Sequence, residues 1–219
     1  MIGGLLQSFP DGYTPNPAQV KLLKNIDQAF EDGYKFVVCN APTGSGKSFI
    51  SKTIGNVSNQ PTKEFRELVT NYLAYRRTHG GGYTYEDECN NEEAFGCTAL
   101  TITKALQDQY TRDFEDIIPL KGKSSYICNL DERSTADSAP CTFSTKLKRE
   151  CWDCNRCDYY ESRNKSITAK ISVENYSSFF HKPDHLKNRQ LIVCDEASEL
   201  ENIIVSRYSC TIEVGKLRK

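Results

Sequence analysis

Residues 41–48 read APTGSGKS, a glycine-rich stretch that ends in Lys47 and Ser48. The apolar run KFVVCN, residues 35–40, comes directly before it and is predicted to be a buried β-strand. A helix is predicted to begin near Gly46 and Lys47. Glycines at such a junction let backbone N–H groups turn toward a phosphate, and the helix N-terminus adds positive potential. The stretch therefore predicts a P-loop that binds ATP with magnesium.

Two side chains at the end of this loop have defined expected roles. The Lys47 ammonium is expected to reach the β- and γ-phosphates, and the Ser48 hydroxyl is expected to ligate magnesium. The residues expected to surround the triphosphate are Thr43, Gly44, Ser45, Gly46, Lys47 and Ser48.

A P-loop also needs acidic residues at the end of a neighbouring strand. Asp195 and Glu196 directly follow QLIVC, residues 190–194, an apolar run predicted to be a strand. Asp195 is expected to hold magnesium, and Glu196 is expected to orient or deprotonate the attacking water. The predicted catalytic residues are therefore Lys47, Asp195 and Glu196.

Strands and helices are predicted to alternate along the chain. Asn16 followed by Pro17 is typical of a helix start, and Gly33 is typical of its end. The predicted strands span residues 35–40, 98–103, 167–173 and 190–194, and further helices are predicted over residues 62–78 and 104–114. Such alternation favours an α/β fold with a mostly parallel sheet that is covered by helices on both faces.

Ten cysteines occur, and five of them are spaced Cys128-x12-Cys141-x9-Cys151-x2-Cys154-x2-Cys157. Thiolates two residues apart can bind one metal centre, and four thiolates are needed for a [4Fe–4S] cluster or a structural zinc, so the spacing leaves both metals open. These cysteines interrupt the alternation, which predicts an insert over residues 121–160 in a P-loop domain formed by residues 1–120 and 161–219. Two others, Cys39 and Cys194, lie in apolar runs and are expected to be buried.

Composition favours a soluble chain. The net charge of −1 neither demands nor excludes a nucleic-acid partner, and residues 79–96 contain an acidic stretch predicted to be an exposed loop. No apolar run approaches the roughly 18–20 residues that cross a bilayer, and the N-terminus lacks the features of a signal peptide. We therefore expect no membrane partner and a location in the cytoplasm, or in the cytoplasm of a host.

Several motifs together resemble the iron–sulfur DNA helicases of superfamily 2, the XPD and DinG group. The resemblance covers nearly the whole chain, and its motifs occur in the order that this family has. Besides APTGSGKS and DEAS (195–198), the motifs are PNPAQ ending at Gln19, TITKALQDQ (101–109), LKGKSSYIC ending at Cys128, and CDYYESRNKSITAKISVENYSSFF (157–180).

The resemblance implies a RecA-like motor domain that couples ATP hydrolysis to movement along single-stranded or forked DNA. In such a domain Gln19 would read adenine, and Thr103 and Lys104 would contact the DNA backbone. The resemblance also implies that the insert holds a [4Fe–4S] cluster, with zinc as the alternative. The implied cluster ligands are Cys128, Cys141, Cys154 and Cys157, with Cys151 as the alternative to Cys154.

In that family the insert lies at the mouth of the DNA path. Basic side chains there could contact phosphates. These are Lys146, Lys148, Arg149 and Arg156. Tyr159 and Tyr160 could stack on bases, although adjacent tyrosines are more often core or hinge residues.

The sequence departs from the family pattern at two motif positions. The family commonly has arginine where Asn16 stands, and usually has a histidine where Ser198 stands, which helps couple hydrolysis to DNA movement. The family also has a second motor domain, whose arginines complete the ATP site. We therefore expect this chain alone to bind ATP, to hydrolyse it slowly and not to unwind DNA, as a truncated product or as half of a split helicase completed by a second polypeptide.

Two other functions fit the same residues. One is a module that grips single-stranded DNA or a partner through a zinc or iron–sulfur knuckle without hydrolysing ATP. The other is a P-loop kinase with a zinc insert, which would leave TITKALQDQ and Gln19 unexplained. Stimulation of ATP hydrolysis by single-stranded DNA distinguishes the motor from the passive binder.

Overall fold

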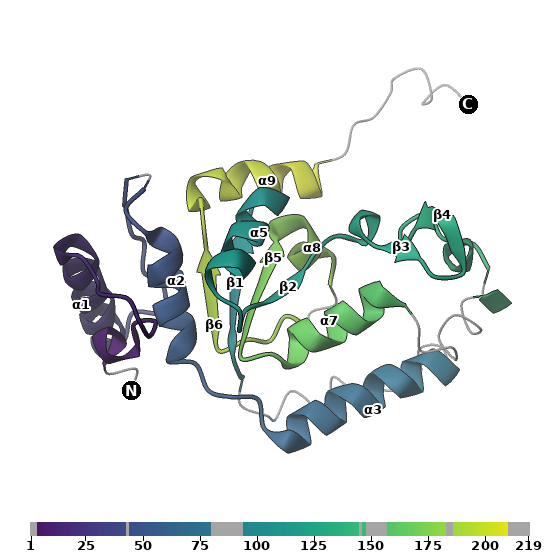
Figure 1. Cartoon of the computed structure of the whole chain (residues 1–219), viewed down its shortest axis with the longest axis horizontal. Coiled ribbons are helices and arrows are strands. Elements are labelled where there is room, and N and C mark those ends of the chain that lie inside the picture. The colour runs from purple at the N-terminus through teal and green to yellow at the C-terminus, as the bar shows by residue number, and fades with distance from the viewer. Residues whose placement is uncertain are drawn as a thin grey trace.

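A four-stranded parallel sheet lies at the centre of the computed structural model, which describes residues 4–42, 44–79, 94–144, 146–147, 157–182 and 186–209. Its strands are β1 (Cys97–Thr101), β2 (Ile118–Leu120), β5 (Ile171–Asn175) and β6 (Leu191–Cys194), in the spatial order β2-β5-β1-β6. Ala99 of β1 lies opposite Val173 of β5 on one side and Val193 of β6 on the other. Because the pairings are parallel, the carboxyl ends of the strands lie along the same edge of the sheet (Figure 1).

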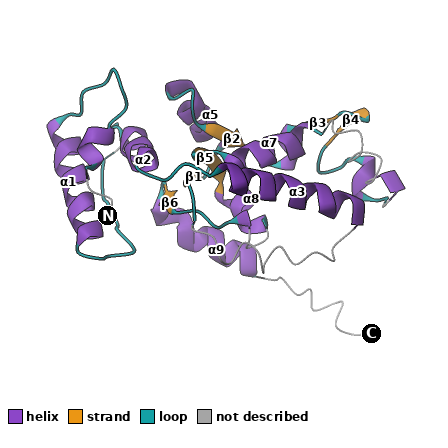
Figure 2. Cartoon of the chain, turned by 90° about the horizontal axis from the view of Figure 1, so that it is seen from below, coloured by secondary structure: helices purple, strands orange, loops and turns teal. Residues whose placement is uncertain are grey.

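The other elements surround this sheet. The α-helices are α1 (Pro17–Glu31), α2 (Lys47–Asn56), α3 (Lys63–His79), α5 (Lys104–Asp113), α7 (Asp158–Thr168), α8 (Tyr176–His181) and α9 (Leu200–Tyr208). Short 3-10 helices are η1 (Leu5–Ser8), η2 (Lys123–Ser125), η3 (Pro140–Thr142) and η5 (Ala197–Glu199), and β3 (Ile127–Cys128) pairs with β4 (Asp131–Thr135) in a small antiparallel sheet. Figures 1 and 2 place α1 and α2 at one end of the molecule and the β3–β4 pair at the other.

Alternation along the strands gives the sheet two apolar faces. On one face Val173 packs in a cluster with Tyr110 of α5 and Phe49 of α2. On the other face Leu100 packs with Tyr176 and Phe179 of α8, beneath residues of α9. The predicted α/β class, with a parallel sheet flanked by helices, is therefore confirmed.

The predicted limits of the first helix are also confirmed. Asn16 is the N-cap of α1, its side chain accepts a hydrogen bond from the Gln19 amide N–H at 2.9 Å, and the Gln19 side chain accepts one from the Asn16 N–H at 2.9 Å. This reciprocal pair is a capping box, and Pro17 occupies the first turn. The chain leaves α1 through Gly33, whose φ of 85° is accessible to glycine at little cost.

The prediction of a buried strand over residues 35–40 is wrong in this structure. Phe36 and Val38 are 90% and 93% exposed, and the segment belongs to neither sheet. An apolar run becomes a strand only where a neighbouring strand accepts its backbone hydrogen bonds, and the described sheet ends at β6 without reaching this segment. Cys39, which lies in it, is exposed, and so is Cys194 at the end of the edge strand β6, so the predicted burial of both thiols is wrong too.

The predicted strand over residues 167–173 is displaced toward the C-terminus. Residues 167 and 168 are the last turn of α7, and β5 begins at Ile171. Ile167 is buried because it packs against Val69 of α3 and Leu186, so its apolar character reflects a contact between helices. The predicted insert contains the β3–β4 pair and η3, while residues 148–156, like residues 80–93 of the acidic stretch, lie outside the described residues.

Arg189 fixes the amino ends of the central strands. Its guanidinium donates hydrogen bonds of 2.8–3.3 Å to four backbone carbonyls, at the end of α7 and at the starts of β1 and β5. Gly96 leads into β1 with φ 66°, and a Cβ there would lie 2.6 Å from an Arg189 nitrogen. Burial lowers the pKa of Arg189 to about 10, so the side chain remains a cation at neutral pH.

Replacing Arg189 with alanine is expected to lower the free energy of unfolding by about 2–4 kcal/mol, because four part-buried carbonyls each lose a charged donor. Arg189→Lys is expected to recover only part of this loss, since one ammonium cannot reproduce the planar fork. Urea unfolding followed by circular dichroism measures both changes. Lys24→Ala, on the exposed side of α1, is the control, and a loss at Arg189 no larger than at Lys24 would contradict the assignment.

Candidate functional site

The glycine-rich loop turns tightly into the N-terminus of α2. Gly44 and Gly46 have φ angles of 79° and 80°, and Gly46 is the N-cap of the helix. The Ser45 N–H donates to the Pro42 carbonyl at 3.2 Å. Lys47 is the first residue of α2, and its ammonium donates to the Ala41 carbonyl at 3.4 Å, so the side chain folds back over the loop. Thr43 lies outside the described residues.

The donors of this loop fit an anion such as a phosphate. The first N–H groups of an α-helix have no acceptor within the helix, and at α2 they follow two glycines in the left-handed conformation. The Ser45 hydroxyl oxygen is buried without a hydrogen-bond partner among the described residues. Backbone donors and a hydroxyl around a helix N-terminus are a donor set that a phosphate satisfies.

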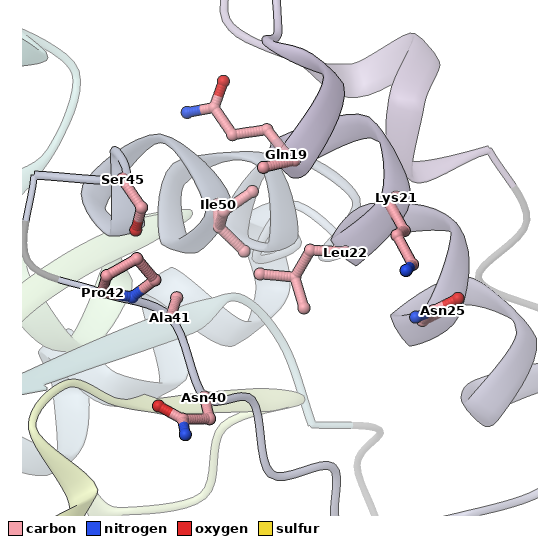
Figure 3. Close-up of a pocket in the computed structure, with 10 residues that line it drawn as sticks. Gln19, Lys21, Leu22, Asn25, Asn40, Ala41, Pro42, Ser45 and Ile50 are labelled. Atoms are coloured by element: carbon pink, nitrogen blue, oxygen red, sulfur yellow. The ribbon is translucent and has the colours of Figure 1, made fainter.

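A pocket of about 280 Å³ lies between α1 and this loop (Figure 3). It is lined by Ala18, Gln19, Lys21, Leu22 and Asn25 of α1, by Asn40, Ala41, Pro42 and Ser45 of the loop, and by Ile50 of α2. Besides completing the capping box, the Gln19 amide donates to the Gly46 carbonyl at 3.3 Å. A Cβ on Gly46 would collide with the Gln19 amide nitrogen. Gln19 therefore connects α1 to the loop, and the φ of 80° at Gly46 favours glycine at this contact.

Asp195 is held at the carboxyl end of β6. Its N–H continues the ladder to the Leu100 carbonyl at 2.9 Å. One carboxylate oxygen accepts from the Glu196 N–H at 3.0 Å, and the other accepts from the Tyr110 hydroxyl at 3.3 Å. The Tyr176 hydroxyl donates to the Asp195 carbonyl at 2.8 Å. Burial raises the pKa of Tyr110, so its phenol keeps the proton that it donates.

The helix after the glycine-rich loop, α2, lies beside the Tyr110 side chain that binds Asp195. Ser51 of α2 donates to the Lys47 carbonyl at 3.1 Å, and Phe49 of the same helix packs against the apolar cluster that contains Tyr110. Tyr110 in turn donates to Asp195. α2 also packs against β6, the strand that ends just before Asp195, which brings the predicted phosphate residues and the predicted magnesium residue to one region. Sequence reasoning missed Tyr110, because a tyrosine on a helix carries no motif signal.

Glu196 has a strained backbone. Its φ and ψ are 53° and 44°, and it is the one non-glycine residue with positive φ among those the structure describes. The left-handed conformation costs a residue with a Cβ about 1–2 kcal/mol. Glu196 is exposed, so no buried contact of its side chain explains the strain. Strain of this kind clusters at functional sites, where it aims a side chain.

The two predicted DNA-contacting residues lie at the start of α5. Thr103 is the N-cap of that helix, and its hydroxyl accepts a hydrogen bond from the Leu106 N–H at 3.3 Å. Lys104 is exposed in the first turn. Thr103 therefore has a role within the protein, while the Lys104 ammonium points into solvent-accessible space at the same edge of the sheet as Asp195.

Three of the predicted cluster cysteines are described. Cys128 is buried in β3, Cys141 is half-buried in η3, and Cys157 is half-buried as the N-cap of α7. The residues that follow the first and last of them are joined, because the Asn129 amide donates to the Asp158 carboxylate at 3.2 Å. The structure therefore brings the chain around Cys128 close to the chain around Cys157.

The remaining ligands are not placed. Cys151 and Cys154 lie outside the described residues, as do Lys148, Arg149 and Arg156, whereas Lys146 is exposed. Within the described part of the chain, no group of three or more His, Cys, Asp or Glu side chains is close enough to hold a metal ion.

The tyrosines that follow Cys157 pack against the protein. The ring of Tyr159 contacts the ring of Tyr126 at 5.6 Å between centroids and that of Tyr160 at 5.3 Å. Lys123 lies over the Tyr159 ring, and burial raises the pKa of the Tyr159 phenol. These contacts favour the core or hinge interpretation over base stacking for Tyr159.

Comparison of the chain with known proteins finds no relative. No protein-family model matches the chain, and no curated protein or solved structure matches it. Among the described residues, no helix has the length and apolar character needed to span a membrane.

Replacing Glu196 with glycine is expected to give a protein about 1 kcal/mol more stable than the Glu196→Ala variant, because glycine adopts the observed φ without a Cβ clash. Both variants lack the carboxylate, so their difference isolates the backbone. Urea unfolding midpoints measure it. Glu201→Gly against Glu201→Ala, in the exposed part of α9, is the matched control with the opposite expected sign. Equal midpoints for the two Glu196 variants would contradict the strain.

Proposed function

We propose that the chain binds MgATP between the glycine-rich loop and the end of β6, as the nucleotide-binding part of a DNA motor of the iron–sulfur superfamily 2 kind. The observation that carries the proposal is the packing of α2, which follows the glycine-rich loop, against β6 and against the cluster of Tyr110, the side chain that binds Asp195. It is supported by a loop whose unpartnered donors suit a phosphate. With this function, the α/β architecture would belong more specifically to the RecA-like class.

Each site residue has a proposed part. The loop amides and Lys47 bind the phosphates, while Ser48 and Asp195 hold Mg²⁺, which supplies charge neutralisation during phosphoryl transfer. The exposed Glu196 carboxylate orients the attacking water and accepts its proton. Gln19, beside the pocket next to the loop, reads the adenine.

The DNA strand is proposed to pass the start of α5, where Lys104 is exposed. Lysine ammonium groups bind nucleic-acid phosphates and release counterions, which makes the affinity fall with salt. The insert, with a [4Fe–4S] cluster held by Cys128, Cys141, Cys157 and either Cys154 or Cys151, is proposed to lie beside this path.

Lys47→Ala is expected to weaken MgATP binding at least about ten-fold, because a charge-assisted contact to the phosphates is lost. Calorimetric titration of the full chain with MgATP measures the affinity. Lys24→Ala, on the exposed side of α1, is the matched control and should bind as the wild type does. Unchanged affinity in the Lys47 variant would refute the proposed site.

Turnover distinguishes a motor from a passive binder. Single-stranded DNA is expected to raise the slow ATP hydrolysis of the wild type and to have no such effect on Asp195→Asn or Glu196→Gln. DNA binding without any effect on hydrolysis in the wild type would favour the passive binder.

Anaerobically purified protein is expected to contain about four irons per chain, whereas about one zinc per chain would replace the cluster assignment with a structural zinc. Cys157→Ser should lower the iron content, because Cys157 is one of the proposed ligands. The exposed Cys39, which lies outside the cysteine-rich segment, provides the control variant Cys39→Ser, whose iron content should stay at the wild-type level. Equal iron loss in both variants would contradict the ligand assignment.

A further inference from the structure

Tyr110 connects three elements of the site while contacting solvent hardly at all. It lies on α5, is 1% exposed, and packs against Ala99 and Val173 of the sheet. Its hydroxyl donates to the Asp195 carboxylate, just after β6, at 3.3 Å, and Phe49 of α2 packs against the same cluster.

The two hydrogen bonds to the Asp195 carboxylate approach it on different oxygens. The Glu196 N–H binds Oδ1 at 3.0 Å, and the Tyr110 hydroxyl binds Oδ2. A carboxylate has about four lone-pair positions. Two donors therefore fix its orientation and leave further lone pairs for a cation.

Packing alone does not explain why residue 110 is a tyrosine, with a hydroxyl group, and not a phenylalanine. The ring of Tyr110 fills the cluster between α2, α5 and the sheet, and phenylalanine would fill it equally well. A buried phenol requires a hydrogen-bond partner, and here that partner is the acid at the end of the strand. Side chains that orient a metal-binding carboxylate in this manner affect metal affinity without touching the metal.

We propose that Tyr110 is a positioning residue that holds the Asp195 carboxylate in the orientation needed for the Mg²⁺ of a bound nucleotide; this inference rests on the proposed ATP site. Tyr110 itself contacts neither nucleotide nor metal. Its removal therefore affects the metal-dependent part of nucleotide binding and leaves the metal-free part unchanged.

The test is calorimetric titration of the full chain with ATP, first in EDTA and then at increasing Mg²⁺ concentration. In Tyr110→Phe, the affinity for metal-free ATP is expected to equal that of the wild type. The Mg²⁺ concentration that gives half of the metal-dependent gain in affinity is expected to rise about ten-fold. The phenylalanine ring retains the packing against Val173, and urea unfolding verifies that the variant is folded.

Tyr176→Phe is the matched control, because it removes an equally buried phenol that binds the Asp195 carbonyl and not its carboxylate. In Tyr176→Phe, the Mg²⁺ concentration that gives half of the gain in affinity is expected to rise less than in Tyr110→Phe. An equal rise in the two variants would overturn the proposal. Asp195→Asn separates the two hypotheses. If Asp195→Asn no longer gains ATP affinity from Mg²⁺ while Tyr110→Phe responds to Mg²⁺ as the wild type does, only the positioning role of Tyr110 is overturned. If Asp195→Asn also responds to Mg²⁺ as the wild type does, the proposed ATP site is overturned together with this inference.

Discussion

The region around Asp195 depends on the parallel pairing of β1 with β5 on one side and β6 on the other. This pairing aligns the strand ends, so that the first residues after each strand meet. Asp195 follows β6 and bonds to Leu100 of β1, Tyr176 follows β5 and bonds to the Asp195 carbonyl, and Tyr110 returns from the helix after β1. Helices that follow two neighbouring strands thus hold Asp195, with Tyr110 at its carboxylate and Tyr176 at its backbone carbonyl.

The two ends of the sheet are stabilised differently. At the amino ends, Arg189 satisfies four backbone carbonyls and so joins α7, β1 and β5. At the carboxyl ends, Glu196 retains an unfavourable left-handed backbone and an exposed carboxylate. A rigid amino end allows the opposite end to tolerate strain, which is the usual distribution between a scaffold and a site built on it.

The described part of the cysteine-rich segment has little core of its own. β3 and β4 form a two-stranded sheet, which is marginal in isolation, and Ile127 and Phe143 are 63% and 84% exposed. It is attached to the sheet domain through the Asn129–Asp158 hydrogen bond and the contact of Tyr126 with Tyr159. A metal centre on the proposed thiolates would supply the stability that burial does not provide here.

The sequence by itself determined the elements whose signals are local. The capping residues Asn16 and Gln19 and the glycines of residues 41–48 predicted where helices begin, since capping depends on neighbours within a few positions. The alternation of strands and helices predicted the parallel sheet, since a helix between two strands returns the chain to the same edge. Only the tertiary structure decided which apolar runs pair as strands. Residues 35–40 and 191–194 read alike, yet only the second pairs with β1, because pairing depends on which edges meet. The placement of Tyr110 against Asp195 likewise joins residues 85 positions apart, and no local pattern encodes that distance.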